Sequence, residues 1–350
     1  MATLTETAYY TRNAVKFGTI GLILLLVLKI SWGVFSSYWK KIHPPPPPPP
    51  TVAFKKLPPI NFPAKKDLPS LVYKLETIEG SIPSLPTIAK VYISVKPEAK
   101  FLSWEKIKEM AGRLGFTNEP TMLTDKIYRF SSNNNPPITL DVDKISGSFK
   151  LSYNFAGDPS IFAEKKLPNN EQAIAEAKSF LQGAGLLEED ITAGEGKVTY
   201  LRYQAPDLVP AISLSEADFV KVGLSRQPLD NLPIVGEDPL NPYLSFIFSG
   251  ARTREKRLIE VNYRYNKIDR EKWATYPLKT ASNAWQQLQA GKGFVACLGN
   301  NPDGQITIRK IYLAYYDSPE PQNFLQPIFV FEGDKDFFAF LPAIEEKWQE

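Results

Sequence analysis

The sequence predicts an α+β protein in which repeated helix-plus-antiparallel-sheet units follow an N-terminal transmembrane helix. Three observations lead to this prediction: a long apolar run near the start, a proline-rich stretch after it, and a helical pattern followed by β-type runs that occurs three times beyond Leu71. The predicted parts are an N-terminal tail, a transmembrane helix, a proline-rich linker and three α+β units, at 1–16, 17–39, 40–70, 71–165, 166–270 and 271–350.

The apolar run 17–39 reads FGTIGLILLLVLKISWGVFSSYW. A helix needs roughly 20 mostly apolar residues to cross a bilayer. Tyr9-Tyr10 precede the run and Tyr38-Trp39 close it, as is typical of aromatic residues at headgroup level. The alternatives are a cleaved secretory signal and a buried soluble helix. We favour a membrane anchor, because no Ala-x-Ala site follows the run and its aromatic end extends it past normal signal length.

Lys29 is the one charged residue in this run. A charge near the middle of a span costs a few kcal/mol on insertion scales and is met either by snorkelling or by a polar partner in the membrane. Both explanations stay open, and Lys29 is a candidate contact for a membrane partner.

Seven consecutive prolines at 44–50 favour the extended polyproline II form at about 3.1 Å per residue. They predict a semi-rigid spacer of roughly 22 Å. It serves as a stalk in the simplest reading, and docking of an SH3-like partner or passage through a cell-surface layer are the alternatives. Further prolines, with the pairs Lys55-Lys56 and Lys65-Lys66, extend the predicted linker to residue 70.

Charge and composition exclude several function classes. Nine of the 41 basic residues lie in 1–70, so 71–350 holds 32 basic and 36 acidic residues. A nucleic-acid binder concentrates positive charge on its folded part, so we expect no nucleic-acid partner. Cys297 is the single cysteine and His43 the single histidine. Ser-His, Cys-His and poly-His metal chemistry are therefore excluded, and we predict no catalytic residues, no cofactor and no metal site.

Each unit opens with a helical pattern that has a capping residue before it and a glycine after it. The caps are Ser103, Asn170 and Thr280, and the glycines are Gly115, Gly183 and Gly291. Runs with β-strand character follow each helix. They lie at 126–131, 138–142 and 146–153, then at 197–203, 219–224, 243–249 and 258–265, and finally at 294–298, 305–316, 324–331 and 337–341.

Tyrosines are dense on two of these predicted strands. Tyr263 and Tyr265 share a face with Val261, and Tyr312 and Tyr316 share a face with Ile306 and Ile308, interrupted by Lys310. Aromatic strand faces serve either as core or as a platform for peptide, glycan or a partner domain. These four tyrosines are therefore candidate partner or ligand contacts.

The third unit carries a family resemblance. TASNAWQQLQAG at 280–291, ITIRKIYLAYY at 306–316 and LQPIFVF at 325–331 resemble the C-terminal part of the YycH/YycI proteins. In that family a helix with an Ala-rich start precedes an I-x-x-(I/V)-x-L-x-Y strand and a (L/I)-x-P-(V/I)-(W/F) strand. The resemblance covers 276–333 and departs in the proline spacer and the middle region. The units also resemble PepSY-type modules.

The resemblance implies a single-pass membrane protein with an extracytoplasmic domain. It also implies a sensor histidine kinase as membrane partner, and no catalytic residues. Lys40 and Lys41 lie closer to the span than Arg12 and Lys16, which by itself favours a cytoplasmic domain. Large domains translocate largely regardless of so small a bias, so we expect the domain outside the cell membrane.

The function expected from the sequence is that of a regulatory or scaffolding protein without chemistry of its own, which binds the bilayer and a partner protein. A binding module for cell-wall glycan or peptide, using the tyrosine faces, is the alternative. An enzyme using carboxylates alone would require two Asp or Glu residues facing each other in a cleft. The sequence makes no prediction of oligomeric state.

Overall fold

The computed structural model describes residues 4–42, 49–64, 68–95 and 104–350. The chain divides into two compact units, Met1–Pro49 and Pro50–Glu350. Most of the predicted polyproline spacer (44–48), Lys65-Lys66 and the predicted cap Ser103 lie outside the described residues.

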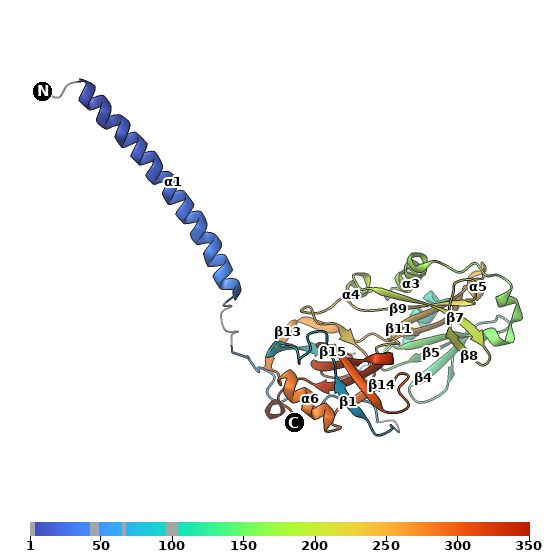
Figure 1. Ribbon diagram of the computed structural model, residues 1–350. Coiled ribbons are helices and arrows are strands. Elements are labelled where there is room, and N and C mark those ends of the chain that lie inside the picture. The colour runs from blue at the N-terminus through green and yellow to red at the C-terminus, as the bar shows by residue number, and fades with distance from the viewer. Residues whose placement is uncertain (1–3, 43–48, 65–67, 96–103) are drawn as a thin grey trace. The chain divides into compact units, whose positions relative to one another are not determined.

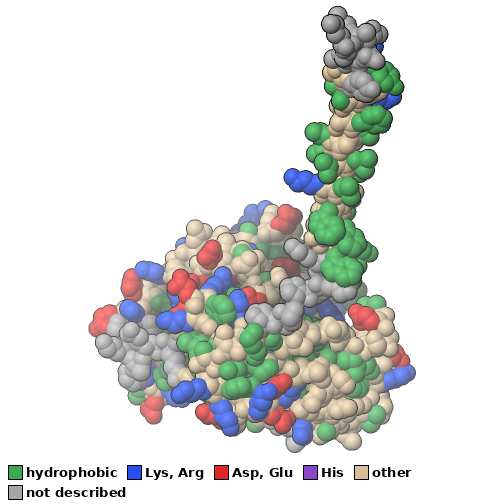
Figure 2. All heavy atoms as spheres, turned by 90° about the vertical axis from the view of Figure 1, so that its left-hand side faces the viewer, with side chains coloured by type: hydrophobic (Ala, Val, Ile, Leu, Met, Phe, Trp, Pro, Cys, Tyr) green, Lys and Arg blue, Asp and Glu red, His purple; other side chains and the backbone are tan. Residues whose placement is uncertain are grey.

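A long helix, α1 (Leu4–Ile42), forms the described part of the first unit. Its stretch Thr11–Trp39 has a mean hydropathy of 2.0, and none of it is buried. Figure 2 shows hydrophobic side chains spread along this helix. The 29 residues of the stretch extend roughly 43 Å, which exceeds the roughly 30 Å of a hydrocarbon core. The predicted span 17–39 thus lies in a helix long and apolar enough to cross a membrane, as a transmembrane or signal helix is.

A nine-stranded antiparallel sheet forms one part of the second unit, with the strand order β3-β4-β5-β6-β12-β11-β9-β7-β8 (Figure 1). The strands are β3 (Thr121–Met122), β4 (Ile127–Ser131), β5 (Ile138–Asp143), β6 (Phe149–Tyr153), β7 (Gly196–Gln204), β8 (Asp207–Pro210), β9 (Phe219–Leu224), β11 (Leu244–Ser249) and β12 (Leu258–Tyr263). Central pairing of β6 with β12 joins strands from two separate stretches of the chain.

Two helices cover one face of this sheet. Ile107 and Ala111 of α2 (Trp104–Arg113) lie in the same core as Ala173, Ala177 and Leu181 of α3 (Asn170–Ala184). A second, smaller core on the sheet includes Ile161 of the 3-10 helix η2. The other short helices are α4 (Glu189–Thr192), α5 (Arg254–Arg257), η1 (Phe155–Gly157), η2 (Pro159–Phe162), η3 (Asp334–Asp336) and η4 (Glu346–Trp348).

The ends of α3 differ slightly from the prediction. Asn169, not Asn170, is the N-cap, and its side chain accepts a hydrogen bond from the Gln172 amide in a capping box. The helix continues past Gly183 to a C-cap at Gly185, where φ is +72°. This left-handed backbone favours glycine, and it decides between the two glycines as the end of the helix.

An eight-stranded sheet forms the other part of the unit. Its strands are β1 (Val72–Leu75), β2 (Ile88–Ser94), β10 (Ile234–Val235), β13 (Ile268–Pro277), β14 (Phe294–Cys297), β15 (Gln305–Tyr316), β16 (Phe324–Gly333) and β17 (Phe337–Pro342). β1 and β10 pair with β15 in parallel, so this sheet is mixed rather than purely antiparallel. α6 (Ala281–Gln289) packs on it through the predicted stripe Ala281, Ala284, Trp285 and Leu288, with Thr280 as the predicted cap.

The mixed helix-and-sheet class is confirmed, with α2, α3 and α6 each preceding a run of strands. The division into units at 71 and 271 needs correction. β1 and β2 belong to the sheet that contains β15, and β13 spans the predicted boundary at 270/271. The residues that complete the C-terminal sheet therefore come from the start of the folded chain, because β15 and β13 need neighbours that the C-terminal residues do not supply.

The predicted linker also needs correction. Leu57 is fully buried and pairs with Gln349, the penultimate residue of the sequence, in a β-bridge. The Phe62 ring stacks on Phe294 at 5.0 Å, and the Gln326 side chain donates a hydrogen bond to the carbonyl oxygen of Pro58. Residues 50–62 are thus part of the folded unit, because their apolar side chains pack against it. The prolines among them interrupt regular secondary structure but do not prevent this packing.

A β-bulge corrects the predicted face of β15. The pairing of β15 with β16 shifts between Ile308 and Lys310, which inserts an extra residue and turns the following side chains over. Ile306 and Ile308 therefore lie in one core, whereas Tyr312 and Tyr316 lie with Ala314 in another.

The packing of Leu57 gives a test of this boundary. We expect Leu57→Ala to lower the free energy of unfolding by about 2–5 kcal/mol, because it leaves a cavity in a core. Urea denaturation followed by tryptophan fluorescence measures the change. The exposed neighbour Lys56 supplies the control, since Lys56→Ala is expected to change stability by no more than about 0.5 kcal/mol. Equal, small effects of both substitutions would show that residues 50–62 do not belong to the fold.

Candidate functional site

A large cleft lies on the helix-covered face of the nine-stranded sheet, between the C-terminal end of α2 and the length of α3. We call it the α2–α3 cleft, and its volume is about 1450 Å³. Small-molecule pockets usually enclose about 300–1,000 Å³, so this cleft exceeds that range. Segments 113–118, 131–134, 166–168, 172–184 and 248–258 contribute to its lining.

The floor of the cleft is apolar. It is formed by Ile138 of β5, Leu151 of β6, Phe248 of β11 and Leu258 of β12, which are neighbouring strands in the centre of the sheet. Phe180 of α3 adds an aromatic wall and packs edge-on against Phe246. Leu151 and Phe248 are buried members of the core shared by the two helices, so the cleft meets that core at the half-buried side chains of Ile138, Phe180 and Leu258.

Basic residues predominate around this floor. The lining includes five basic side chains, Arg113, Lys166, Arg252, Arg254 and Arg257, and two acidic ones, Glu176 and Glu255. Arg257 binds Glu176 in a bidentate pair with distances of 2.8 and 3.0 Å, and it also donates hydrogen bonds to the carbonyl oxygens of Lys166 and Ser249. Arg257 therefore fixes the cleft wall, while the remaining basic side chains are exposed.

A close backbone crossing fixes one end of the cleft. Gly250 lies against the chain segment 164–166, and a Cβ atom at this position would approach the carbonyl oxygen of Glu164 to 2.2 Å. Only glycine permits this approach. At the other end, the Asn118 side chain donates to the carbonyl oxygen of Ser131 and to Oδ1 of Asn133, each at 2.9 Å. These contacts hold the loops that carry the cleft's polar groups.

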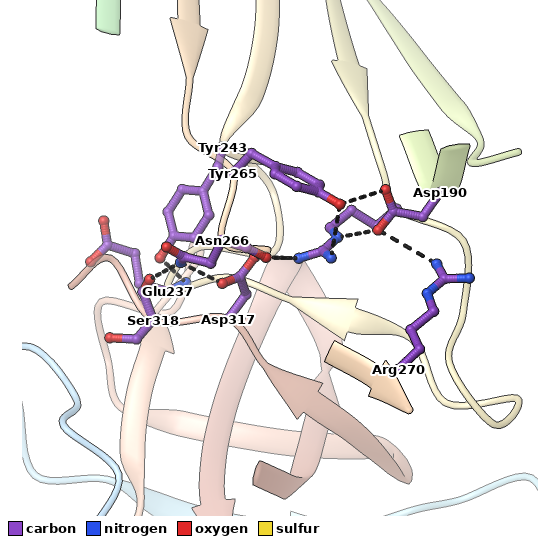
Figure 3. A network of polar contacts seen from close by, with 9 residues as sticks. Asp190, Glu237, Tyr243, Tyr265, Asn266, Arg270, Asp317 and Ser318 are labelled. Carbon is purple, nitrogen blue, oxygen red and sulfur yellow. Dashed lines mark hydrogen bonds and ion pairs between the residues drawn. The ribbon is translucent and has the colours of Figure 1, made fainter. Parts of the chain in front are cut away.

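A second candidate is a buried polar network between the two sheets (Figure 3). The Arg226 Nε donates to Asp190 at 2.7 Å, and its Nη1 donates to Asp317 at 3.2 Å and to the carbonyl oxygen of Asn266 at 3.0 Å. The guanidinium lies 4.4 Å from the centre of the Tyr265 ring, whose hydroxyl donates to the other Asp190 oxygen at 3.0 Å. Each of these residues that contacts Arg226 is therefore held by an ion pair or a hydrogen bond.

Electrostatics in this network favour a charged arginine between two carboxylates. Burial opposes the charge on Arg226, but Asp317 and Asp190 outweigh that effect and raise the pKa of its guanidinium. Burial raises the pKa of the Asp317 carboxyl, and the attraction to Arg226 opposes the rise. Asn266 holds Asp317 in place by donating to Oδ1 at 2.7 Å.

A smaller pocket of about 330 Å³ adjoins the network and is lined by Arg226, Asp317, Tyr243 and Arg264, among others. Arg264 stacks on the Tyr243 ring at 4.6 Å, and the Tyr243 hydroxyl accepts a hydrogen bond from the Glu237 amide. The polar groups that line this pocket therefore contact one another. Within the part of the chain that the structure describes, no cluster of His, Cys, Asp and Glu is arranged to hold a metal ion.

The structure separates the residues predicted as contacts. Tyr263 is 8% exposed and stacks on Phe149, Tyr265 lies in the Arg226 network, and Tyr316 is 1% exposed. Tyr312 is half-buried, with the Lys310 ammonium 4.9 Å from its ring centre. Lys29 is exposed on α1 in the first unit. Tyr263 and Tyr316 thus serve as core residues, and neither predicted tyrosine face forms a continuous exposed platform.

Sequence reasoning did not find the cleft or the network. The sequence did contain one signal, the run RTREKR at 252–257, in which four of six residues are basic. Asp190 ends the acidic run Glu188-Glu189-Asp190, whose charges are typical of a solvated surface, yet it is 2% exposed and pairs with Arg226. Arg226 follows β9 in the sequence, and only the fold brings it next to Asp190.

Comparisons with known proteins find distant structural neighbours and no matching family. No protein-family model matches the chain, and no curated protein matches it. An uncharacterized protein from Eubacterium rectale aligns with a TM-score of 0.32 and 10% sequence identity, over 73% of this chain and 82% of its own. The YpeB C-terminal domain of Bacillus megaterium aligns with a TM-score of 0.30 and 11% identity, over 70% of this chain and 94% of its own. At these TM-scores neither likeness assigns a family.

The Arg226 network predicts how the stability of the fold depends on pH. We expect Arg226→Met to lower the free energy of unfolding by about 3–5 kcal/mol, because it removes the cation that lies between two buried carboxylates. Without the arginine the pKa of the Asp317 carboxyl rises further in the folded state, so the loss grows as pH increases from about 4 to about 7. Urea denaturation at several pH values measures it.

Asp317→Asn supplies the decisive comparison. Added to Arg226→Met, it removes one of the unpaired charges and should restore part of the stability lost at neutral pH. The exposed Arg202, replaced in the same way, is the control and should have little effect at any pH. A pH-independent loss in Arg226→Met, unrelieved by Asp317→Asn, would contradict this account.

Proposed function

We propose that this chain is a membrane-anchored, non-catalytic protein that regulates or scaffolds a partner protein in or near the cell envelope. The observation that carries the proposal is the exposed apolar stretch Thr11–Trp39 of α1, joined to a separate compact unit. In a bilayer such a helix satisfies its backbone hydrogen bonds internally, and its exposed apolar side chains are solvated by lipid. The folded unit is then held at the membrane surface.

We place that unit outside the cell, with a single pass of the membrane. The resemblance to YycH/YycI proteins and the proline spacer support this orientation, as does the weak effect of a small lysine bias on a large domain. The same resemblance supports a membrane protein such as a sensor kinase as the partner. In this proposal the three helix-and-strand stretches are repeated PepSY-like modules. Their shared order of a helix followed by antiparallel strands supports this.

Binding without chemistry follows from the side chains that the chain carries. A single histidine and a single cysteine do not supply the nucleophile and base of the common hydrolases. Partner recognition requires a concave or apolar surface instead, and the α2–α3 cleft is of that kind.

Glycan or peptide binding through tyrosine-rich strand faces is the alternative. Such a platform requires exposed rings side by side. Tyr263 and Tyr316 are buried and Tyr265 bonds within the Arg226 network, which leaves Tyr312 as the half-exposed member of the predicted set. We therefore favour partner binding at another surface.

Fractionation and protease treatment test the anchor and its orientation. We expect the full-length chain to stay with the membrane fraction after an alkaline carbonate wash and to leave it only with detergent. Protease added to intact cells is expected to digest residues 51–350, and the control is the same digestion after lysis. Recovery of the full chain in the soluble fraction would overturn the anchor, and digestion only after lysis would reverse the orientation.

Replacement of Lys29 tests whether the span itself binds a partner. We expect Lys29→Leu to weaken capture of a membrane protein in mild detergent, because it removes the one charge that a partner helix would pair within the membrane. Lys16→Leu, at the edge of the apolar run, is the matched control. If Lys29→Leu keeps every partner that the unchanged chain captures, the lysine snorkels and the contact lies elsewhere.

A further inference from the structure

We propose that the α2–α3 cleft binds an acidic segment of a partner protein, whose apolar side chains lie on the floor of the cleft and whose carboxylates meet the basic residues around it. This inference rests on the proposed function, because it specifies the kind of partner that the folded unit recognises. Three observations support it. The lining is more basic than the domain around it, its basic side chains are unpaired or weakly paired, and its floor is apolar.

The charge of the lining differs from that of the domain around it. Residues 71–350 hold more acidic than basic residues. In the cleft, once Arg257 and Glu176 are set aside as a pair, four basic side chains face one acidic side chain, Glu255. A concave surface with one sign of charge concentrates ligands of the opposite sign.

The basic side chains around the cleft are free to bind a ligand or are weakly held. Among the described residues, Lys166 and Arg254 have no carboxylate within salt-bridge distance, and both are exposed. Arg113 pairs with Glu109 at 2.7 Å and Arg252 with Glu164 at 3.7 Å, both in solvent-exposed positions. Exposed pairs of this kind contribute about 0–1 kcal/mol, so carboxylates of a ligand can replace them at small cost.

The floor distinguishes a peptide from other anions. A sugar-phosphate polymer would satisfy the basic residues but leave the half-buried side chains of Ile138, Phe180 and Leu258 uncovered. A peptide that carries both carboxylates and apolar side chains covers the floor and meets the cations. The volume of about 1450 Å³ accepts a segment of chain rather than a single side chain, and the walls on two sides exclude a flat protein surface.

Groups for a peptide backbone are also present. Asn134, Gln172 and Ser179 line the cleft with side chains that both donate and accept hydrogen bonds. Ser179 lies on the exposed side of α3 and lines the cleft. Backbone groups of a bound segment would thus find partners without a strand being added to the sheet.

Labelled peptides and the full-length chain in detergent test the proposal by fluorescence anisotropy. The probe is a short peptide that combines Asp and Glu with Phe and Leu. Two companion peptides separate the contributions, one with Lys in place of the acidic residues and one with Ser in place of the apolar residues. We expect saturable binding of the first peptide, weakened by added salt, and at least about tenfold weaker binding of both companions.

Charge reversal locates the binding. Lys166→Glu and Arg254→Glu should each lower the affinity for the acidic peptide by about tenfold, because an attraction is replaced by a repulsion. Lys197→Glu and Arg202→Glu are matched controls, since both residues are exposed on β7 of the same sheet and neither lines the cleft. The controls are expected to retain the affinity of the unchanged chain.

A steric block tests the floor without altering charge. Ser179→Trp should fill the space above the floor and abolish binding, whereas Ser282→Trp on the exposed side of α6 should not. Circular dichroism of each variant verifies that the fold is kept.

Three outcomes would overturn the proposal: no saturable binding of the acidic peptide, equal binding of all three peptides, or unchanged binding in the cleft variants. Displacement of the peptide by polyphosphate of equal charge would assign the cleft to a phosphate polymer and overturn it as well. The proposed membrane function fails independently, in the fractionation experiment. Peptide binding in detergent does not depend on the orientation of the anchor, and loss of peptide binding leaves the membrane fraction unchanged.

Discussion

The buried guanidinium of Arg226 determines how the two sheets of the folded unit meet. Asp190 lies in α4, beside the nine-stranded sheet, and Asp317 directly follows β15 of the eight-stranded sheet. Tyr265 and Asn266 belong to the connection that leads from β12 to β13, that is, from one sheet to the other. A buried charge is costly unless each of its donors has a partner, so the arginine tolerates few other arrangements of these segments. The network therefore specifies a relative position of the sheets, which apolar contacts alone specify less sharply.

The α2–α3 cleft follows from the width of the sheet that forms its floor. Nine strands at about 4.8 Å spacing make a sheet roughly 38 Å wide, whereas two helices of about 10 Å diameter cover little more than half of it. The pairing of β6 with β12 brings the two groups of strands together in the middle, and α3 packs on β7 and β9 while α2 contacts α3. Ile138 and Leu258 of the central strands then stay half-buried at the cleft. A concave surface with partly exposed apolar side chains suits a ligand or a partner.

The apolar helix and the α2–α3 cleft depend on different parts of the chain. The apolar helix requires only length and hydropathy, and both are present in its own residues. The cleft requires segments from 113 to 258 to come together on one sheet. Residues 50–62 are part of the folded unit, because Leu57 and Phe62 pack against its C-terminal strands. Any spacer between helix and fold is therefore shorter than the proline content up to residue 70 indicates.

The sequence alone determined the helix, most strands, the stripe of α6 and the mixed α and β class, because these depend on patterns among neighbouring residues. It did not determine the faces of β15, since one bulged residue reverses them, or the place of β1, β2 and β13, since strand pairing joins residues far apart in the chain. The candidate site belongs to this second group. The basic run 252–257 was visible, but its position beside α3 and an open floor was decided by the tertiary structure. Asp190 and Arg226 likewise look like surface charges in the sequence, and only the fold removes both from water and gives each the other as its partner.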